Sequence, residues 1–162
     1  MLARRPYSIA EIRRVLEKKY PEGEQVSEAI ARLRELGYLD DRKFAEQYAY
    51  SLAQNRAFGP HRLRRELKGK LVNHQEIESA VQRAYQETPE QTLLERALDK
   101  KVRNIRLPLS RTKFHSLCQS LMRLGFNAGD IIKAVRARPE LAPVAGEVEV
   151  SDLEGGETNS EL

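Results

Sequence analysis

Apolar side chains recur along this chain at intervals of three and four residues, which is the spacing of one face of an α-helix. Almost no segment alternates apolar and polar residues with the period of two expected of a half-buried strand. The pattern therefore predicts an all-α fold of eight helices. Their apolar positions include Ile12 and Leu16, Ile30 and Leu33, Phe44 and Tyr48, Leu63 and Leu67, Ile77 and Val81, Leu94 and Leu98, Leu117 and Leu121, and Ile131 and Val135.

Capping residues mark where these helices begin. Ser8 followed three residues later by Glu11 predicts a capping box, in which each side chain bonds the other's backbone N–H. Pro60 stands where a first helical residue needs no N–H donor. The predicted N-caps are Ser8, Asp40, Asn73, Ser110 and Asn127. Because each cap contributes about 1 kcal/mol, short helices joined by tight turns are expected.

One spacing of apolar residues occurs three times and indicates an internal repeat. The triplets are Ile12, Leu16, Ile30; Leu63, Leu67, Val81; and Leu117, Leu121, Val135, and in each the last residue follows the others by 18 and 14 positions. The repeats are offset by 51 and then 54 residues. Leading helices are predicted over 41–55 and 89–104, whereas only six residues precede Tyr7.

The repeat predicts a helical body over residues 1–138, made of tandem three-helix units that resemble a helix-turn-helix in size. The units cover about 7–38, 39–87 and 88–138, and the first lacks its leading helix. Units this small bury little apolar surface alone, so neighbouring units are expected to stack. Residues 139–162 have no periodicity and are predicted to be a disordered acidic tail.

Charge is distributed unevenly along the chain. The 28 Lys and Arg residues exceed the 24 Asp and Glu residues, for a net charge of +4. Seven of the acids and none of the bases lie in 139–162, so residues 1–138 carry a net charge of +11. A basic body of this kind favours a polyanionic partner, either a nucleic acid or an acidic protein assembly built on one.

Other classes of protein are disfavoured by what the sequence lacks. No apolar run approaches the roughly 18–20 residues that span a bilayer, and no secretory signal is apparent, so a cytoplasmic protein is expected. The single Cys118 excludes an internal disulfide and is expected to be a core residue rather than a nucleophile. Adjacent Asp40 and Asp41 diverge on a helix and make a poor metal site. With no catalytic constellation or phosphate-binding loop, we predict no enzyme activity and no cofactor.

Basic residues on equivalent helices are the candidate binding site. Arg13 and Arg14 precede Leu16 as Arg64 and Arg65 precede Leu67, and these apolar positions place the arginines away from the core. A further group shares one helical face in the predicted sixth helix. The candidate residues are Arg13, Arg14, Lys19, Arg62, Arg64, Arg65, Lys68, Lys70, Arg96, Lys100 and Arg103. We call them the basic stripe. They are predicted to contact phosphates or an acidic protein surface, and a merely solvated helix face is the alternative.

Two blocks of sequence resemble a known family. Gly37-Tyr38-Leu39-Asp40-Asp41-Arg42-Lys43-Phe44-Ala45 and Gly59-Pro60-His61-Arg62-Leu63-Arg64-Arg65-Glu66-Leu67 are similar to the paired signature of the RecX regulatory family. The family pattern is G-Y-L-D-D-x-x-F-A followed by G-P-x-R-L-R-x-E-L, and the resemblance covers about residues 7–138. It implies tandem three-helix repeats, in agreement with the repeat found from the spacing. This chain differs from the family in its missing first helix and its acidic tail.

The resemblance also implies a function. RecX-like proteins bind the RecA recombinase filament on single-stranded DNA and inhibit its ATPase, strand exchange and coprotease activities. It implies RecA as partner, with single-stranded DNA as a further contact, and we expect a monomer. A helix-turn-helix protein that reads duplex DNA is the alternative. The last helices of the units, around Ile30, Val81 and Val135, are poor in the Arg and Asn that read bases, which argues against it.

Overall fold

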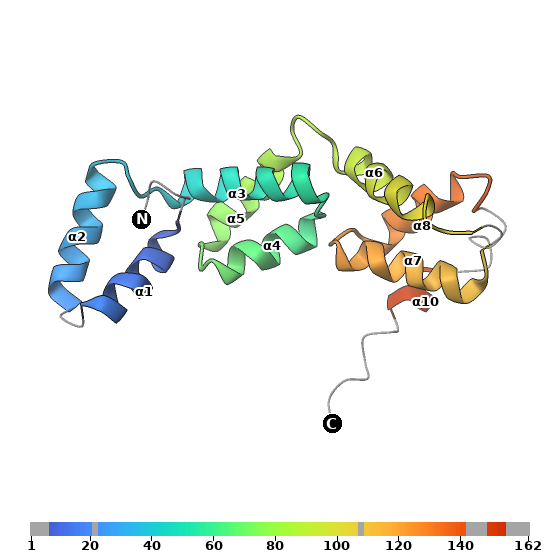
Figure 1. Ribbon diagram of the computed structural model, residues 1–162. Helices are drawn as coiled ribbons and strands as arrows, with labels where there is room; N and C mark the ends of the chain where they lie inside the picture. The colour runs from blue at the N-terminus through green and yellow to red at the C-terminus, as the bar shows by residue number, and fades with distance from the viewer. Residues whose placement is uncertain (1–6, 21–22, 107–108, 142–148, 155–162) are drawn as a thin grey trace, which may run out of the picture. The chain divides into compact units, whose positions relative to one another are not determined.

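The computed structural model describes residues 7–20, 23–106, 109–141 and 149–154, and every regular element in these ranges is an α-helix. This confirms the predicted all-α fold. The helices are α1 (Ile9–Lys19), α2 (Gly23–Glu35), α3 (Asp41–Arg56), α4 (Pro60–Gly69), α5 (His74–Ala84), α6 (Glu90–Val102), α7 (Arg111–Arg123), α8 (Ala128–Arg136) and α10 (Val150–Glu154), as Figure 1 shows. None of these helices is long and apolar enough to cross a membrane.

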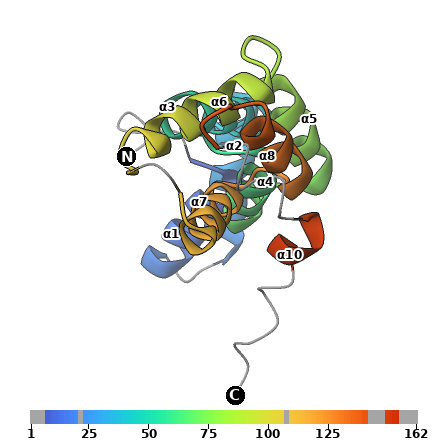
Figure 2. The ribbon, with the colours of Figure 1, turned by 90° about the vertical axis from the view of Figure 1, so that its right-hand side faces the viewer.

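The described residues form two compact units. Unit 1 contains those up to residue 52 together with 63–87, and unit 2 contains 53–62 together with those from 88 onward. Helices α3 and α4 each belong partly to both units. In unit 2, helices α6, α7 and α8 pack against one another in pairs (Figure 1 and Figure 2). The first two predicted three-helix units thus lie together in unit 1, apart from residues 53–62.

The predicted N-caps are confirmed by hydrogen bonds. The Ser8 hydroxyl accepts from the Glu11 N–H at 3.1 Å, and the reciprocal bond completes the capping box. Asp40 Oδ1 accepts from the Lys43 N–H at 3.0 Å. The side chains of Asn73, Ser110 and Asn127 likewise accept from the first turns of α5, α7 and α8. Local side-chain chemistry therefore begins these helices where the sequence indicates.

The repeated apolar positions form the core. Eight of the nine residues in the three triplets are buried, and Leu16 is partly buried against the others of its cluster. In unit 1, Ile12, Ile30 and Leu39 pack together with Val26. In unit 2, α8 buries Ile131 and Val135 between the apolar faces of its neighbours. The residues at the 18- and 14-residue spacing are thus equivalent core positions in the three repeats.

The prediction that residues 139–162 are disordered is wrong for the described part of that segment. Leu141 is 0% exposed and Leu153 is 2% exposed. Val150–Glu154 form α10, which packs against α7 and α8 (Figure 1). Two buried leucines order this segment within unit 2. The prediction of disorder rested on the overall acidic composition of the segment, which does not reveal the contribution of single apolar residues. The rest of the predicted tail, residues 142–148 and 155–162, lies outside the described residues.

In unit 1, the beginning of α1 is tied to the end of α4. The Ser8 hydroxyl, which is fully buried, donates to the Lys70 carbonyl oxygen at 2.8 Å. Lys70 Nζ pairs with the Glu11 carboxylate at 2.7 Å. The Ile9 N–H donates to Asp41 Oδ1 at 2.8 Å. The carboxylate of Asp41, in the first turn of α3, therefore also satisfies a backbone donor at the first turn of α1.

In unit 2, the beginning of α4 meets the end of α7 in a close contact between backbone segments. The Gly59 N–H donates to the Leu124 carbonyl at 2.7 Å, and the His61 N–H donates to the Gly125 carbonyl at 3.1 Å. A Cβ on Gly59 would lie 2.4 Å from the carbonyl carbon of Gly125. A Cβ on Gly125 would lie 2.4 Å from the Arg62 nitrogen, and Gly125 has φ +96°. Only glycine permits this approach.

We predict that Gly125→Ala lowers the free energy of unfolding by ~2–4 kcal/mol, because it combines a left-handed backbone with a clash against fixed backbone. Urea denaturation followed by circular dichroism measures this. Gly69→Ala is the control, since a Cβ there meets nothing within 4 Å. Equal stability of Gly125→Ala and wild type would contradict the contact.

Leu71 provides the opposite test. It has φ +59° at the position equivalent to Gly125 and its side chain is half exposed. Because a left-handed conformation costs a residue with a Cβ roughly 1–2 kcal/mol, we predict that Leu71→Gly raises the free energy of unfolding by up to about 1 kcal/mol. The same denaturation experiment measures this change, and a marked loss of stability would show that the Leu71 side chain matters more than its backbone.

Candidate functional site

The first signature block, residues 37–45, builds the junction between α2 and α3. Gly37 has φ +73° and follows the end of α2, in the left-handed conformation that glycine adopts after many helices. Leu39 is buried, Asp40 caps α3 and Asp41 accepts from Ile9. Tyr38 is 66% exposed, although a tyrosine between Gly37 and the buried Leu39 would be expected to pack against the turn. Apart from that ring, the block is structural.

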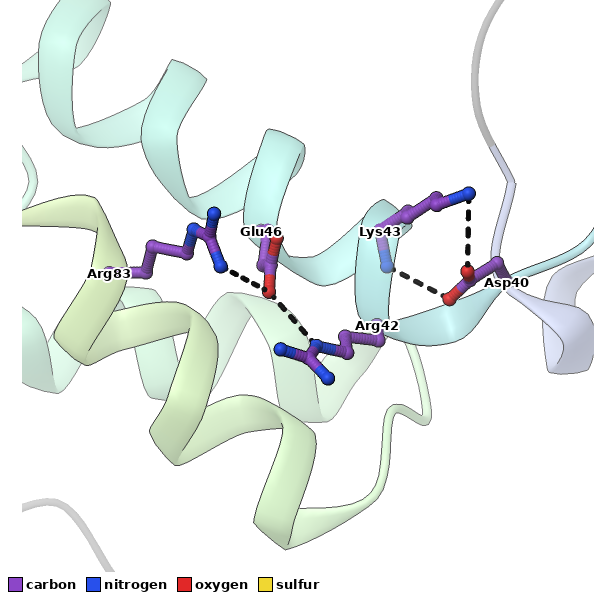
Figure 3. Close-up of polar contacts among 5 residues, drawn as sticks. All are labelled: Asp40, Arg42, Lys43, Glu46 and Arg83. Carbon is purple, nitrogen blue, oxygen red and sulfur yellow. Dashed lines mark hydrogen bonds and ion pairs between the residues drawn. The ribbon is translucent and has the colours of Figure 1, made fainter.

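The charged residues of this junction neutralise one another. Figure 3 shows the carboxylate of Glu46 between Arg42, at 3.2 Å, and Arg83 of α5, at 3.5 Å. Lys43 lies 3.8 Å from Asp40. Arg42 and Arg83 are mostly exposed, so these pairs contribute little stability. Their effect is that α3 presents little unbalanced positive charge at its beginning.

The second signature block, residues 59–67, is also largely engaged within the fold. Arg62 donates to the Arg123 carbonyl at 3.0 Å and lies over the Phe58 ring, with 4.2 Å between the guanidinium carbon and the ring centre. Arg64 binds both carboxylate oxygens of Glu78, and its Nε and Nη2 lie 2.8 and 2.9 Å from them. These hydrogen bonds lower the pKa of Glu78. Both arginines therefore have structural partners.

The eleven residues of the basic stripe divide into two groups. Four are held by the fold: Arg13 (near Glu17 and Ser27), Arg62, Arg64 and Lys70. The other seven have exposed side chains with no hydrogen bond or ion pair within the described residues, namely Arg14, Lys19, Arg65, Lys68, Arg96, Lys100 and Arg103. Lys19 makes only a cation–π contact with its neighbour Tyr20. Of these seven exposed residues, Arg14 and Lys19 lie on α1, Arg65 and Lys68 lie on α4, and the other three lie on or just after α6.

Two residues of the basic stripe, Arg96 and Lys100, line a pocket of 940 Å³ in unit 2. Its walls are one face of α6, one face of α7 and the end of α3. Arg103 is not among the lining residues. The pocket adds Lys101 and Arg106, and it also brings in Arg56 and Lys113, which the sequence did not single out. No sequence spacing indicates that Arg56, at the end of α3, lies near α6. Arg56 and Lys113 are therefore recognised as lining residues only from the folded structure.

The pocket is unusual in its charge. Six cationic side chains line it, and no Asp or Glu is among its described lining residues. None of the six has an ion pair within the part of the chain that the structure describes. The lining between them includes apolar Leu93, Ala97, Ile105, Leu117 and Leu124. An apolar wall surrounded by unbalanced positive charge suits a ligand that is both anionic and partly apolar.

Metal-ligating side chains and the single cysteine are the remaining candidates for chemistry. Within the described residues, no group of three or more His, Cys, Asp or Glu side chains is arranged to hold a metal. Cys118 is 0% exposed, which confirms its predicted place in the core. Desolvation by burial raises the pKa of its thiol to about 12. At neutral pH the group is therefore a protonated, inert thiol rather than a thiolate nucleophile.

We predict that Cys118 in the folded protein does not react with a chromogenic disulfide reagent at neutral pH, because the thiol is protonated and inaccessible. Absorbance on release of the reagent's thiolate measures the reaction. The same protein in guanidinium chloride serves as the positive control and is expected to react fully. Rapid labelling without denaturant would show that α7 opens readily around this residue.

Comparison with known proteins identifies relatives. Residues 40–81 match the family described as "RecX, second three-helix domain". The regulatory protein RecX of Oceanobacillus iheyensis is 28% identical over 154 residues, which are 95% of this chain and 56% of that protein. RecX of Trichlorobacter lovleyi is 36% identical over 72 residues, 44% of this chain and 47% of that protein. The chain thus spans about half the length of these curated relatives.

Solved structures show the same fold. The crystal structure of RecX from Lactobacillus salivarius superposes with a TM-score of 0.73, at 20% identity, over 84% of this chain and 88% of that one. A second crystal structure, of a regulatory protein RecX, gives a TM-score of 0.70 over 80% of this chain and 63% of that one. At this level of identity the superpositions support the helical-repeat architecture.

Proposed function

We propose that this chain, as a member of the RecX family of regulatory proteins, binds the filament of RecA on single-stranded DNA and slows RecA's ATPase, strand exchange and coprotease activities. The relatives are named as regulatory proteins, and in keeping with that we propose no chemical step and no cofactor. We propose further that it acts as a cytoplasmic monomer.

The observation that carries this proposal is the set of seven exposed, unpaired cations of the basic stripe. They lie on α1, α4 and the α6 region, so they are spread over all three sequence repeats. A RecA–DNA filament is a repeating anionic polymer. Several modest charged contacts spread over repeated modules suit such a polymer, because each contact raises the effective concentration of the next.

The four cations that the fold engages make a weaker contribution to this surface. Arg64 and Lys70 each pair with a carboxylate of unit 1, and a contact with the filament would compete with the ion pairs to Glu78 and Glu11. We therefore assign contact with the filament to Arg14, Arg65 and their unpaired neighbours. Bridging between adjacent RecA protomers would hold the filament in a state with slow ATP turnover.

We predict that sub-stoichiometric amounts of this protein reduce ATP hydrolysis by RecA on single-stranded DNA. A coupled assay that follows NADH oxidation measures the rate, and RecA without this protein sets the reference. The physical reason is that one bridging molecule restrains several protomers. An unchanged rate at every ratio of the two proteins would refute the proposal.

A charge-reversal variant localises the contact. We predict that Arg14→Glu combined with Arg65→Glu raises the concentration needed for half-inhibition roughly tenfold, which corresponds to about 1.4 kcal/mol. Neither side chain has a partner within the described residues, so the variant is expected to fold.

The matched control is Arg32→Glu combined with Lys133→Glu, which makes the same change of net charge on exposed positions of α2 and α8. It is expected to inhibit RecA nearly as well as wild type. If the two double variants inhibit equally, net charge alone governs the effect, and α1 and α4 are not the contact surface.

A further inference from the structure

The cationic pocket of unit 2 gathers six positive side chains that have no carboxylate partner within the described residues. In unit 1, seven cation–carboxylate pairs lie within the fold, although Arg14, Lys19, Arg65 and Lys68 form none within the described residues. The pairs are Arg13–Glu17, Arg32–Glu35, Arg42–Glu46, Lys43–Asp40, Arg64–Glu78, Lys70–Glu11 and Arg83–Glu46. Around the pocket, Arg56, Arg96, Lys100, Lys101, Arg106 and Lys113 lack any such pair within the described residues. Bringing six like charges together is unfavourable unless an anion balances them.

The shape of the pocket restricts which anion fits. A cavity of 940 Å³ exceeds the needs of a single phosphate and matches the size of ordinary small-molecule sites. Leu93 and Ala97 of α6 and Leu117 of α7 supply apolar surface, and the same two helices carry four of the six cations. A ligand that fills the pocket must present a flat or apolar group to these side chains and negative charge to the cations.

Uncharged polar groups complete the lining. Asn55, Asn104 and two serines of α7 add amides and hydroxyls that both donate and accept hydrogen bonds. Gln54 also lines the pocket, and its buried Nε2 has no hydrogen-bond partner in the described structure, while its Oε1 accepts from Thr88. Such groups match the edges of nucleobases, which carry donors and acceptors together. Carboxylates of an acidic peptide only accept.

We propose that this pocket binds single-stranded nucleic acid, with a base against the apolar wall and the flanking phosphates on the six cations. Each nucleotide carries one negative charge and one flat apolar face, so its chemistry complements the pocket. In a duplex the bases are stacked and paired, so they cannot enter a concave site. This site rests on the proposed function in one respect, because the RecA filament would be the source of the single strand that it binds.

The test uses the full chain without RecA. Fluorescence anisotropy of a dye-labelled oligothymidylate is measured with wild type and with Lys100→Glu combined with Lys113→Glu, two exposed positions on the pocket walls. Wild type is expected to bind, and the double variant to bind at least tenfold more weakly. Because each lost phosphate contact removes about 0.7 from the slope of log affinity against log salt, the variant's slope is expected to fall by about 1.4.

The matched control is Lys43→Glu combined with Lys133→Glu, which makes the same change of net charge at exposed positions outside the pocket. It is expected to lose less than twofold in affinity. A labelled oligouridylate distinguishes RNA from DNA as the source of the strand, and binding of either supports the site. Duplex DNA and poly-glutamate serve as competitors and are expected to displace the strand poorly.

Three results would overturn the inference: no binding of any single strand by wild type, equal losses in the two double variants, or poly-glutamate displacing the strand more effectively than unlabelled oligonucleotide does. The last would assign the pocket to an acidic protein segment. Failure here is separable from failure of the proposed function. If wild type inhibits RecA but does not bind a single strand directly, only the proposal for the pocket is refuted. If it binds a strand but has no effect on RecA, only the proposed regulation of RecA is refuted.

Discussion

The structure depends on one contact that occurs twice, in which the beginning of a helix is joined to the end of its equivalent in the next repeat. In unit 1 the Ser8 hydroxyl donates to the Lys70 carbonyl, and in unit 2 the Gly59 N–H donates to the Leu124 carbonyl. Ser8 and Gly59 differ by 51 positions, and Lys70 and Leu124 by 54, which are the two offsets of the repeat. A three-helix unit buries too little surface alone, so its stability depends on such joints. The same joint is made with a side chain in one place and with bare backbone in the other.

Much of the fold was predictable from the sequence because its determinants are local. Caps such as Ser8 and Asn73 act within one turn, and the 18- and 14-residue spacing sets which side chains meet inside a unit. Glycine at residue 37 followed from the same local logic. The C-terminal segment was misjudged because its order depends on two buried leucines, Leu141 and Leu153, and on the packing of α10 against α7 and α8, helices outside the segment itself. Composition averages do not register individual anchors of this kind.

The candidate site was less predictable because charge pairing is a property of tertiary structure. Arg64 and Arg65 are neighbours in sequence and look equivalent, yet within the described residues only Arg64 pairs with a carboxylate, that of Glu78 on the next helix. Lys70 pairs with Glu11, which lies 59 positions earlier. The opposite holds at the pocket, where Arg56 and Lys113 come from distant segments to join Lys100. A count of basic residues gives the excess of positive charge. The tertiary structure determines which of those residues lack a carboxylate partner.

The anchoring of α10 has a practical consequence for dividing the protein into pieces. Leu141 and Leu153 are buried to nearly the same extent as the leucines of the central helices. A chain cut after residue 138, where the repeats end, would leave the surfaces of α7 and α8 that α10 covers open to water. Exposed apolar patches of this sort promote self-association, so a shortened protein would form aggregates for reasons unrelated to its biology. A fragment intended to behave as the whole does should retain residues through Glu154.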